Sequence, residues 1–325
     1  MATYKGIKGF SIQNLSADPS NPIEGEMWYN STSNVWKVEE ATASGAWATG
    51  NNMNTARYYL AGAGTQTATL AFGGVDPTTF TGATEEYNGA TWASNPTGLN
   101  TARGYFAGCG TQTAGLAFGG LIPPGTGATE EYNGSTWTSS NSLNTARYGL
   151  AGAGIQTAGL AFGGYITPVT GATEEYDGIS WTSSNSMITA RYTLGGAGIQ
   201  TAALAFGGDL GATNTTATEE YDGNSWTSVN SMNTTRRQLA GAGTQTAGLA
   251  FGGYDTAPTG ATEEYDGNSW TSSPASLSTA RYALAGAGTQ ASALAFGGEV
   301  NPPITAATEE WTGPGVGVTK TITVS

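Results

Sequence analysis

The sequence has few of the residues that metal and redox sites require. Its 325 residues contain no histidine, a single cysteine (Cys109) and four lysines, at positions 5, 8, 37 and 320. Without clusters of His or Cys, sites for zinc, copper or haem are not expected. A single cysteine forms no disulfide within the chain, and the lack of a disulfide framework says little about compartment. The sequence therefore predicts no cofactor and no metal.

Positive charge and long apolar runs are also scarce. The formal net charge is −13, with 11 Lys and Arg against 24 Asp and Glu, so no basic surface is expected to neutralise nucleic-acid phosphates. No run of 18 apolar residues is present, which predicts no membrane-spanning helix. The N-terminal stretch MATYKGIKGFSIQNLS has no continuous apolar segment, so no ordinary signal peptide is expected.

A repeat of 44 to 46 residues organises the chain. It is marked by an arginine that usually ends a Thr-Ala-Arg triplet, at Arg57, Arg103, Arg147, Arg191, Arg236 and Arg281. Self-similarity at this period is typical of propellers, solenoids or arrays. No segment shows helical spacing of apolar residues, whereas short stretches rich in Thr, Tyr, Phe and Trp, bounded by Gly and Asn, predict four strands per repeat. Asn88-Gly89 and its counterparts predict type I′ turns between the third and fourth strands.

These residues resemble the kelch repeat. A kelch unit has a Gly-Gly pair ending its second strand, a Tyr in the third and a Trp in the fourth, here Gly73-Gly74, Tyr87 and Trp92. The resemblance covers about residues 45–313, although the four residues between Tyr87 and Trp92 form a shorter connection than is usual in kelch repeats. It implies an all-β fold: a six-bladed β-propeller of four-stranded antiparallel blades, and it implies no particular chemistry.

The two ends of the repeat block complement each other. Trp47 stands eight residues before Thr55, and every fourth-strand Trp stands eight or nine residues before the next triplet, yet no first three strands precede Trp47. The last copy has a third strand ending at Trp311 but no fourth-strand Trp. We therefore expect the strand at Trp47 to complete the last blade and close the ring. Residues 44–313 are the predicted propeller, and residues 314–325 a further strand whose pairing the sequence leaves open.

Residues 1–43 are predicted to form an arm and a small β module. The segment from Pro22 to Trp47, with Trp28-Tyr29-Asn30, Lys37-Val38 and Gly45-Ala46-Trp47, resembles a short module of bacteriophage tail-fibre and other virion proteins. The resemblance implies localisation in the virion, attachment to other virion proteins through the N-terminal arm, and a homo-oligomer in the particle. Virion proteins leave the cell by lysis, which accounts for the missing signal peptide.

Two interpretations of the repeated residues stay open. The Trp and third-strand Tyr residues form the core between blades or else a ring of sugar-stacking platforms. The six arginines pair with acidic groups or carbonyls, or else aim a ring of guanidinium groups at an anionic ligand. The stretches after the Gly-Gly pairs vary most, and they include Tyr165 and Tyr254. We expect these loops, the two tyrosines and the arginine ring to form the ligand-binding face.

Catalysis is not expected. Each Glu-Glu pair, such as Glu85-Glu86, recurs in all six copies, and no copy adds an acid, base or nucleophile to the pattern. The turn from Tyr221 to Trp226 is similar to a sialidase Asp-box, but it lacks the residue between Asp and Gly. The predicted function is a phage virion structural protein that displays a propeller, as a tail-fibre adhesin or exterior decoration that binds a host-surface glycan or protein. The alternative is a lectin-like carbohydrate-binding propeller unconnected with phage.

Overall fold

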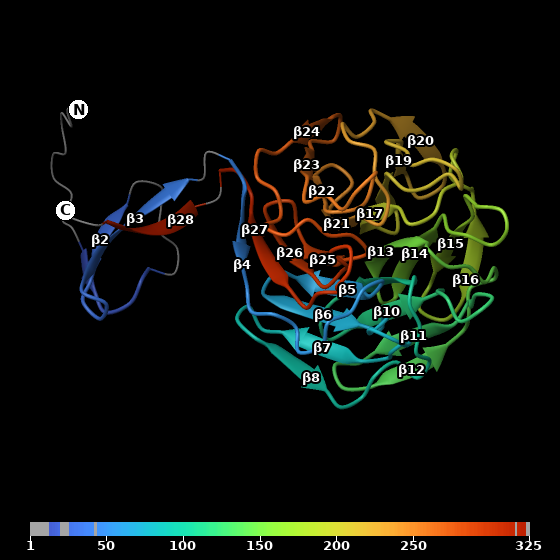
Figure 1. Ribbon diagram of the computed structural model, residues 1–325, viewed down its shortest axis with the longest axis horizontal. Helices are drawn as coiled ribbons and strands as arrows, with labels where there is room; N and C mark the ends of the chain where they lie inside the picture. The colour runs from blue at the N-terminus through green and yellow to red at the C-terminus, as the bar shows by residue number, and fades with distance from the viewer. Residues whose placement is uncertain (1–12, 20–25, 42–43, 316, 323–325) are drawn as a thin grey trace. The chain divides into compact units, whose positions relative to one another are not determined.

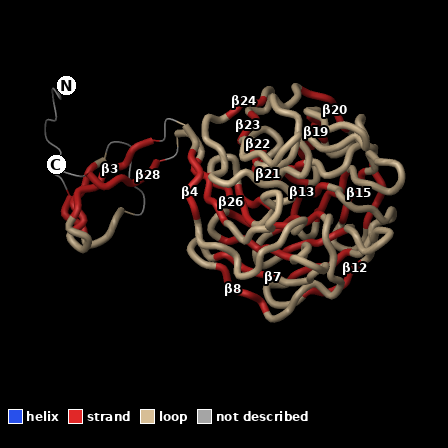
Figure 2. Tube along the Cα trace, in the orientation of Figure 1, coloured by secondary structure: helices blue, strands red, loops and turns tan. Residues whose placement is uncertain are grey.

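Strands are the only regular elements among the residues that the computed structural model describes, which are 13–19, 26–41, 44–315 and 317–322. Figure 2 shows these short strands separated by loops and turns. The chain divides into two compact units: the described residues before Ala46 and after Thr312, and the segment Ala46–Thr312. In the described part of the chain there is no helix long and apolar enough to cross a bilayer.

The larger unit consists of six four-stranded antiparallel sheets, one for each copy of the repeat. Sheet 1 contains β5 (Ala61–Thr65), β6 (Ala68–Phe72), β7 (Thr84–Tyr87) and β8 (Trp92–Asn95). Sheet 2 contains β9 (Ala107–Gly110), β10 (Gly115–Phe118), β11 (Thr129–Tyr132) and β12 (Trp137–Ser140), and sheet 3 contains β13 (Ala151–Ile155), β14 (Ala158–Phe162), β15 (Thr173–Tyr176) and β16 (Trp181–Ser184). Sheet 4 contains β17 (Gly195–Ile199), β18 (Ala202–Phe206), β19 (Thr218–Tyr221) and β20 (Trp226–Val229), and sheet 5 contains β21 (Ala240–Gly243), β22 (Gly248–Phe251), β23 (Thr262–Tyr265) and β24 (Trp270–Ser272).

Sheet 6 is completed by a strand from the other end of the segment. It contains β25 (Ala285–Gly288), β26 (Ser292–Phe296), β27 (Thr308–Thr312) and β4 (Ala46–Thr49). Strand β4 pairs antiparallel with β27, with Trp47 opposite Trp311, so the expected completion of the last sheet by the Trp47 strand is confirmed. The Trp47 ring also packs against Phe251 of sheet 5, at 5.0 Å between ring centroids.

The six sheets have a propeller-like arrangement. Figure 1 shows them following one another in sequence order around a common centre, with β5, β13, β17, β21 and β25 nearest to it. These innermost strands carry Gly at the position that faces the neighbouring sheet. A Cβ atom on Gly62 would lie 2.6 Å from Cζ of Phe296 and 2.8 Å from the carbonyl oxygen of Gly286. Glycine is therefore required there for the inner strands to approach closely.

Apolar packing between successive sheets forms the core. The second strand of each sheet is almost wholly buried, and Phe72 and Leu70 of sheet 1 pack against Trp137 and Tyr132 of sheet 2. The fourth-strand tryptophans of sheets 1 to 5 are at most 7% exposed, and Trp47 of sheet 6 is partly buried against the core. Their burial confirms the core interpretation for the Trp and third-strand Tyr residues, and it leaves no ring of sugar-stacking tryptophans.

Polar bonds repeat across every boundary between sheets. The indole of Trp137 donates to Thr84 Oγ1 of the preceding sheet at 2.9 Å, and Gln112 donates to the carbonyl oxygens of Thr69 and Tyr87. The same contacts join the last sheet to the first, because Trp92 donates to Thr308 and Gln66 donates to the carbonyl oxygens of Ala293 and Trp311. Equivalent bonds satisfy backbone groups at the strand ends, where unpaired buried groups are costly.

The turn between the third and fourth strands differs from the type I′ prediction. In sheet 1 only Gly89 of the Asn-Gly pair has a positive φ, of 86°. The side-chain oxygen of Asn88 accepts hydrogen bonds from the backbone N–H groups of Ala90 and Thr91. The connection is thus a four-residue loop closed by an Asx turn, in which Asn or Asp is selected for its side-chain acceptor.

The smaller unit is a four-stranded sheet in the order β1 (Gln13–Leu15), β2 (Met27–Asn30), β3 (Val35–Ala41) and β28 (Gly317–Ile322). Strand β28 pairs antiparallel with β3, which settles the pairing that the sequence left open. Strand β1 pairs parallel with β2, so part of the predicted arm is an edge strand. Residues 1–12 and 20–25, which make up the rest of that arm and its junction with the module, lie outside the described residues.

Asp18 connects the arm to the sheet of the smaller unit. Its carboxylate accepts hydrogen bonds from Trp28 Nε1 at 3.0 Å and Asn30 Nδ2 at 2.7 Å, and it pairs with Lys37 Nζ at 2.5 Å. These donors, with Lys37 first, lower the pKa of Asp18 to about 2. The side chains of Trp28 and Asn30 are buried, whereas Tyr29, Lys37 and Val38 of the same motif are partly exposed.

Candidate functional site

The six repeat arginines are fully buried, which corrects the expectation that they form a ligand-facing ring. Each has 0% exposure and pairs with the first glutamate of the Glu-Glu pair in its own copy, as Arg57 does with Glu85 at 2.9 Å. The partners of the other five are, in order, Glu130, Glu174, Glu219, Glu263 and Glu309. Burial lowers the pKa of these guanidinium groups, and the neighbouring carboxylate opposes that shift.

The buried ion pairs hold the bases of the variable loops. Arg57 donates to the carbonyl oxygens of Gly73 and Ala83, at the two ends of the loop that separates β6 from β7. The carboxylate of Glu85 also accepts from the backbone N–H groups of Asn54 and Thr55 in the connection that enters the sheet. One ion pair thus ties three segments together, and its role is to position the loop.

In five of the six copies the second glutamate of the pair makes a different contact, which the sequence analysis did not identify: it accepts a hydrogen bond from a tyrosine of the next sheet. Tyr132 of sheet 2 donates its hydroxyl hydrogen to Glu86 of sheet 1, and Tyr176 donates to Glu131 in the same way. Alternation along the strand sends the two carboxylates to opposite faces, one toward the arginine and one toward the next sheet. In sheet 6 the tyrosine is replaced by Trp311, whose indole donates instead to the carbonyl oxygen of Gln290.

The variable loops and the entrance to the innermost strands share one face. Residue Val75, the first after Gly73-Gly74, forms an isolated bridge with Tyr58, which follows Arg57. Equivalent bridges join Gly104 to Leu121, Tyr148 to Tyr165, Tyr192 to Asp209, Arg237 to Tyr254 and Tyr282 to Glu299. The residues that differ most between copies therefore meet around the centre of this face.

A ring of six backbone hydrogen bonds surrounds the centre of that face. It is formed by the second residue after each repeat arginine, here called the mouth ring: Tyr59, Tyr105, Gly149, Thr193, Gln238 and Ala283. The N–H of each residue donates to the carbonyl oxygen of its counterpart in the preceding sheet, at 2.6 to 3.1 Å, and Tyr59 donates to Ala283. All six have a positive φ of 49° to 64°. This left-handed conformation lets one residue bond to both neighbours in the ring.

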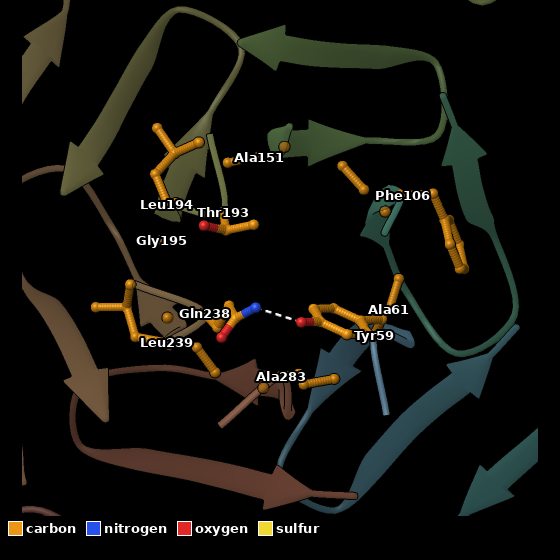
Figure 3. A pocket seen from close by; sticks show the side chains of 18 of the residues that line it. Tyr59, Ala61, Phe106, Ala151, Thr193, Leu194, Gly195, Gln238, Leu239 and Ala283 are labelled. Carbon is orange, nitrogen blue, oxygen red and sulfur yellow. Dashed lines mark hydrogen bonds between the residues drawn. The ribbon is translucent and has the colours of Figure 1, made fainter. Parts of the chain in front are cut away.

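The mouth ring lines a central cavity of about 150 Å³ together with the first residues of the innermost strands. Figure 3 shows Tyr59 and Gln238 extending toward each other across the opening, where the Gln238 amide donates to the Tyr59 hydroxyl. The Tyr105 ring stacks on Tyr59, with 3.4 Å between centroids and 20° between planes. Sequence reasoning missed this site, although its signal was present: the mouth-ring position varies while the Arg and Leu or Phe around it recur.

Partly buried tyrosines extend outward from the mouth ring. Rings follow one another from Tyr105 to Tyr148 at 6.1 Å, to Tyr165 at 5.3 Å and to Tyr192 at 5.4 Å. On another part of the face Tyr254 contacts Tyr282 at 5.2 Å, and Arg237 lies over the Tyr254 ring while pairing with Asp209. The two tyrosines predicted to bind ligand, Tyr165 and Tyr254, therefore belong to this aromatic surface.

The acidic residues and the cysteine form no metal-ligand cluster among the described residues. There, no group of three or more Cys, Asp and Glu side chains is placed to hold a metal ion. Cys109, which stands where the first copy has the small residue Ala63, is buried, and burial raises the pKa of its thiol to about 12.

The sequence matches no protein-family model, and no curated protein matches it. The aromatic face and the mouth ring are thus interpreted from their own chemistry.

Proposed function

We propose that the six sheets are the blades of a closed, six-bladed, kelch-like β-propeller. Four sets of contacts between neighbouring sheets support this: the Trp–Thr bonds, the Gln–carbonyl bonds, the mouth ring, and the bonds from the second Gly of each Gly-Gly pair to the next arginine carbonyl. Each set continues from the last sheet to the first, as in the 2.8 Å bond from Gly298 N to the Arg57 carbonyl oxygen. A ring of this kind has no open edge between sheets 6 and 1.

The function that the geometry supports best is adhesion by a bacteriophage virion structural protein. The observation that carries it is the difference between the two ends of the sheets. Loops of six different sequences and the varied mouth ring share one face, whereas the turns at the other ends, such as Gln66-Thr67, are nearly uniform. Recognition on rigid scaffolds usually lies in such variable loops. The smaller unit, with its resemblance to a virion module, joins the propeller to other virion proteins in an oligomeric particle.

We infer no catalytic role. The first glutamate of each Glu-Glu pair is committed to a buried pair with the repeat arginine, and five of the six second glutamates accept a hydrogen bond from a tyrosine of the next sheet. Catalysis needs acids and bases in distinct environments. The negative net charge of the chain and the absence of charged side chains in the mouth ring favour a glycan or protein partner at the host surface over nucleic acid.

Two experiments test this function. Gold-labelled antibody against the full chain should decorate phage particles released from cells that express it, and unlabelled particles would contradict virion localisation. Replacing all six loops with the stretch 121–127 should leave a folded protein that no longer attaches to host cells. A matched control replaces Ile155 and Ile199, at the strand ends beside the opposite turns, with the Thr that the four other copies have, and should leave attachment intact. Attachment by the loop-exchanged protein would place the binding surface elsewhere.

The second candidate is a lectin-like propeller unconnected with phage. The tyrosine-rich variable face favours it, because aromatic rings suit carbohydrate whatever the source of the chain. The two candidates differ in the role of the smaller unit. A lectin would bind its ligand equally well with or without particle association, and antibody labelling of particles separates them.

A further inference from the structure

Two acidic residues occupy the same position of the repeat on the variable face, directly after the Gly-Gly pair. They are Asp209 in sheet 4 and Glu299 in sheet 6, where the other copies have Val, Leu, Tyr and Tyr. Each forms an isolated bridge with the tyrosine that follows the repeat arginine of its own sheet, Tyr192 or Tyr282. Burial raises the pKa of both phenols, and so does the hydrogen bond that each makes to its carboxylate. The two acids therefore have equivalent surroundings within their own sheets.

At Asp209 the next sheet supplies a cation. Arg237 of sheet 5 pairs with this carboxylate, at 2.7 Å between Nη1 and Oδ2, and its guanidinium lies over the Tyr254 ring, 5.4 Å from the centroid. The Arg237 side chain is partly exposed, whereas Asp209 is buried. An ion pair and a cation–π contact thus hold one basic side chain at the surface of this face. Arg237 is also the only basic residue of the larger unit besides the six repeat arginines.

At Glu299 the corresponding cation is missing. The residue of the next sheet that corresponds to Arg237 is Tyr58 of sheet 1, because both directly follow a repeat arginine. Burial and then the charge of Glu299 raise the pKa of the Tyr58 phenol, so the carboxylate lies near this ring. No Lys or Arg in the described part of the chain forms an ion pair with Glu299. The boundary between sheets 6 and 1 therefore has the carboxylate and the aromatic rings but no positive charge.

The groups at this boundary can be reached by a partner. Glu299, Tyr58 and Tyr282 are all half-buried, in contrast to the fully buried repeat arginines and to Asp209. The bond from the Tyr282 hydroxyl uses one of about four acceptor positions of the carboxylate, which leaves others for a second donor. A partly buried carboxylate is stabilised by a paired cation, and tyrosine ring faces attract the same kind of group.

The pair of Asp209 and Arg237 indicates which cation fits. It is a guanidinium, or an ammonium, on a flexible side chain, and proteins present these groups as arginine and lysine. The six variable loops contain no basic residue and four acidic ones, so complementary charge favours a basic protein surface. The acidic residues are Asp76, Asp209, Asp255 and Glu299. Tyrosine-rich loops on a rigid scaffold are also typical of surfaces that bind proteins.

We propose that Glu299, Tyr58 and Tyr282 form a binding site for a basic side chain, arginine or lysine, of a host-surface protein. The incoming cation takes, between sheets 6 and 1, the place that Arg237 holds between sheets 4 and 5. This inference rests on the proposed adhesive function and names the chemistry of the partner.

The first test uses the full-length protein and the capped peptide acetyl-Gly-Arg-Gly-amide, titrated by NMR beside its lysine analogue and its neutral citrulline analogue. The two cationic peptides should bind at least tenfold more tightly than the citrulline peptide. Glu299→Gln keeps an acceptor for Tyr282 and should weaken binding of the cationic peptides roughly tenfold. Asp222→Asn is the matched control, because it removes the same charge from a turn at the opposite end of sheet 4, where Asn88 and Asn133 show that Asn forms the same turn. It should bind as the unmodified protein does.

A second variant fills the site from within the chain. Tyr58→Arg places a guanidinium beside Glu299, as Arg237 lies beside Asp209, and should abolish peptide binding while the protein keeps its thermal transition. Tyr148→Arg adds the same charge to the same face, but the preceding sheet has Leu121 at the acidic position. This control should leave peptide binding unchanged.

Several outcomes would overturn the proposal. They are equal binding of the arginine and citrulline peptides, unchanged affinity of Glu299→Gln, a loss in Asp222→Asn equal to that in Glu299→Gln, and undiminished binding by Tyr58→Arg. Protease treatment of host cells should abolish attachment, and attachment that survives protease but is lost on periodate oxidation would identify a glycan instead. Attachment that depends on the loops but not on Glu299 would overturn this site while leaving adhesion in place. Failure of the loop exchange to affect attachment would overturn adhesion through this face itself.

Discussion

At the scale of single residues, the repeated charged groups act inside the fold. Arg147 has no exposed surface, donates to the carbonyl oxygens of Gly163 and Thr145, and pairs with Glu174. Glu174 in turn accepts from the backbone of Asn144. Breaking such a buried pair leaves an uncompensated charge, which costs much more than the pair itself contributes.

Replacement of Arg147 by Met should therefore lower the free energy of unfolding by about 3–5 kcal/mol. Urea denaturation monitored by tryptophan fluorescence measures this loss. The double variant R147M/E174Q should recover part of it, because the glutamine is neutral and still offers an acceptor to Asn144. A single variant as stable as the unmodified protein would mean that the pair is solvated, contrary to its burial.

The third-strand tyrosines predict an alkaline limit to stability. Burial, and then the hydrogen bond to the Glu131 carboxylate, raise the pKa of Tyr176 to about 12 from an unfolded value of about 10. Because the folded state favours the protonated phenol, this contribution is complete below about pH 10 and is lost as the pH rises toward 12. The melting temperature should fall across that window, and less steeply in Tyr176→Phe. Calorimetry from pH 9 to 11.5 tests this, and equal slopes for both proteins would remove Tyr176 as a cause.

At the scale of elements, β4 is the strand on which the last sheet depends. It supplies the fourth strand of sheet 6, and the Trp47 indole donates to Thr262 of sheet 5 at 2.8 Å. Without it β27 would present an unpaired edge, and such edges promote association between molecules.

Two truncations isolate this strand. Deletion of residues 1–52 should produce a protein that melts far lower or aggregates, whereas deletion of 1–44 keeps β4 and should preserve the main thermal transition. Scanning calorimetry and light scattering provide the measurements. Equal transitions in the two truncated proteins would show that β4 is dispensable to the larger unit.

At the scale of the whole molecule, a closed ring and a linear array of sheets predict different effects of deleting one repeat, even though neighbouring sheets make the same contacts in both. In an array, stability is approximately a sum of repeat and interface terms, so one repeat is dispensable. In a ring of fixed curvature, removal of one repeat would leave a gap, so the contacts between the last sheet and the first would all be lost.

Deletion of residues 147–190 joins Ala146 directly to Arg191 and so preserves every local sequence pattern. We expect loss of the cooperative unfolding transition, seen by calorimetry, because five sheets do not span the same circle. Deletion of the loop residues 122–124, which removes no strand, is the control and should leave the transition in place. A cooperative and equally stable five-repeat protein would favour an open array.

The sequence alone determined the all-β class, the four strands of each copy, and the partner of the Trp47 strand. These follow from local signals, namely the period of the repeat, the bounding glycines and the spacing from Trp to the next triplet. Burial of the tryptophans could also be anticipated, because large aromatics at every interface position are typical of core packing. The type I′ turn predicted from Asn88-Gly89 was wrong, because the side-chain oxygen of Asn88 accepts backbone hydrogen bonds and sets a different turn.

Only the tertiary structure decided what the arginines and the mouth ring do. From the sequence alone, an Arg and a Glu about 28 residues apart could have met in the interior or faced solvent separately. Only the folded structure shows that the pair meets at the base of the variable loop between them. The mouth ring unites six residues spread from Tyr59 to Ala283, and neighbouring members are brought together by the ring of hydrogen bonds between sheets. Their approach depends on the glycine-lined inner strands packing closely around one centre, and that packing is a property of six sheets together and of no single repeat.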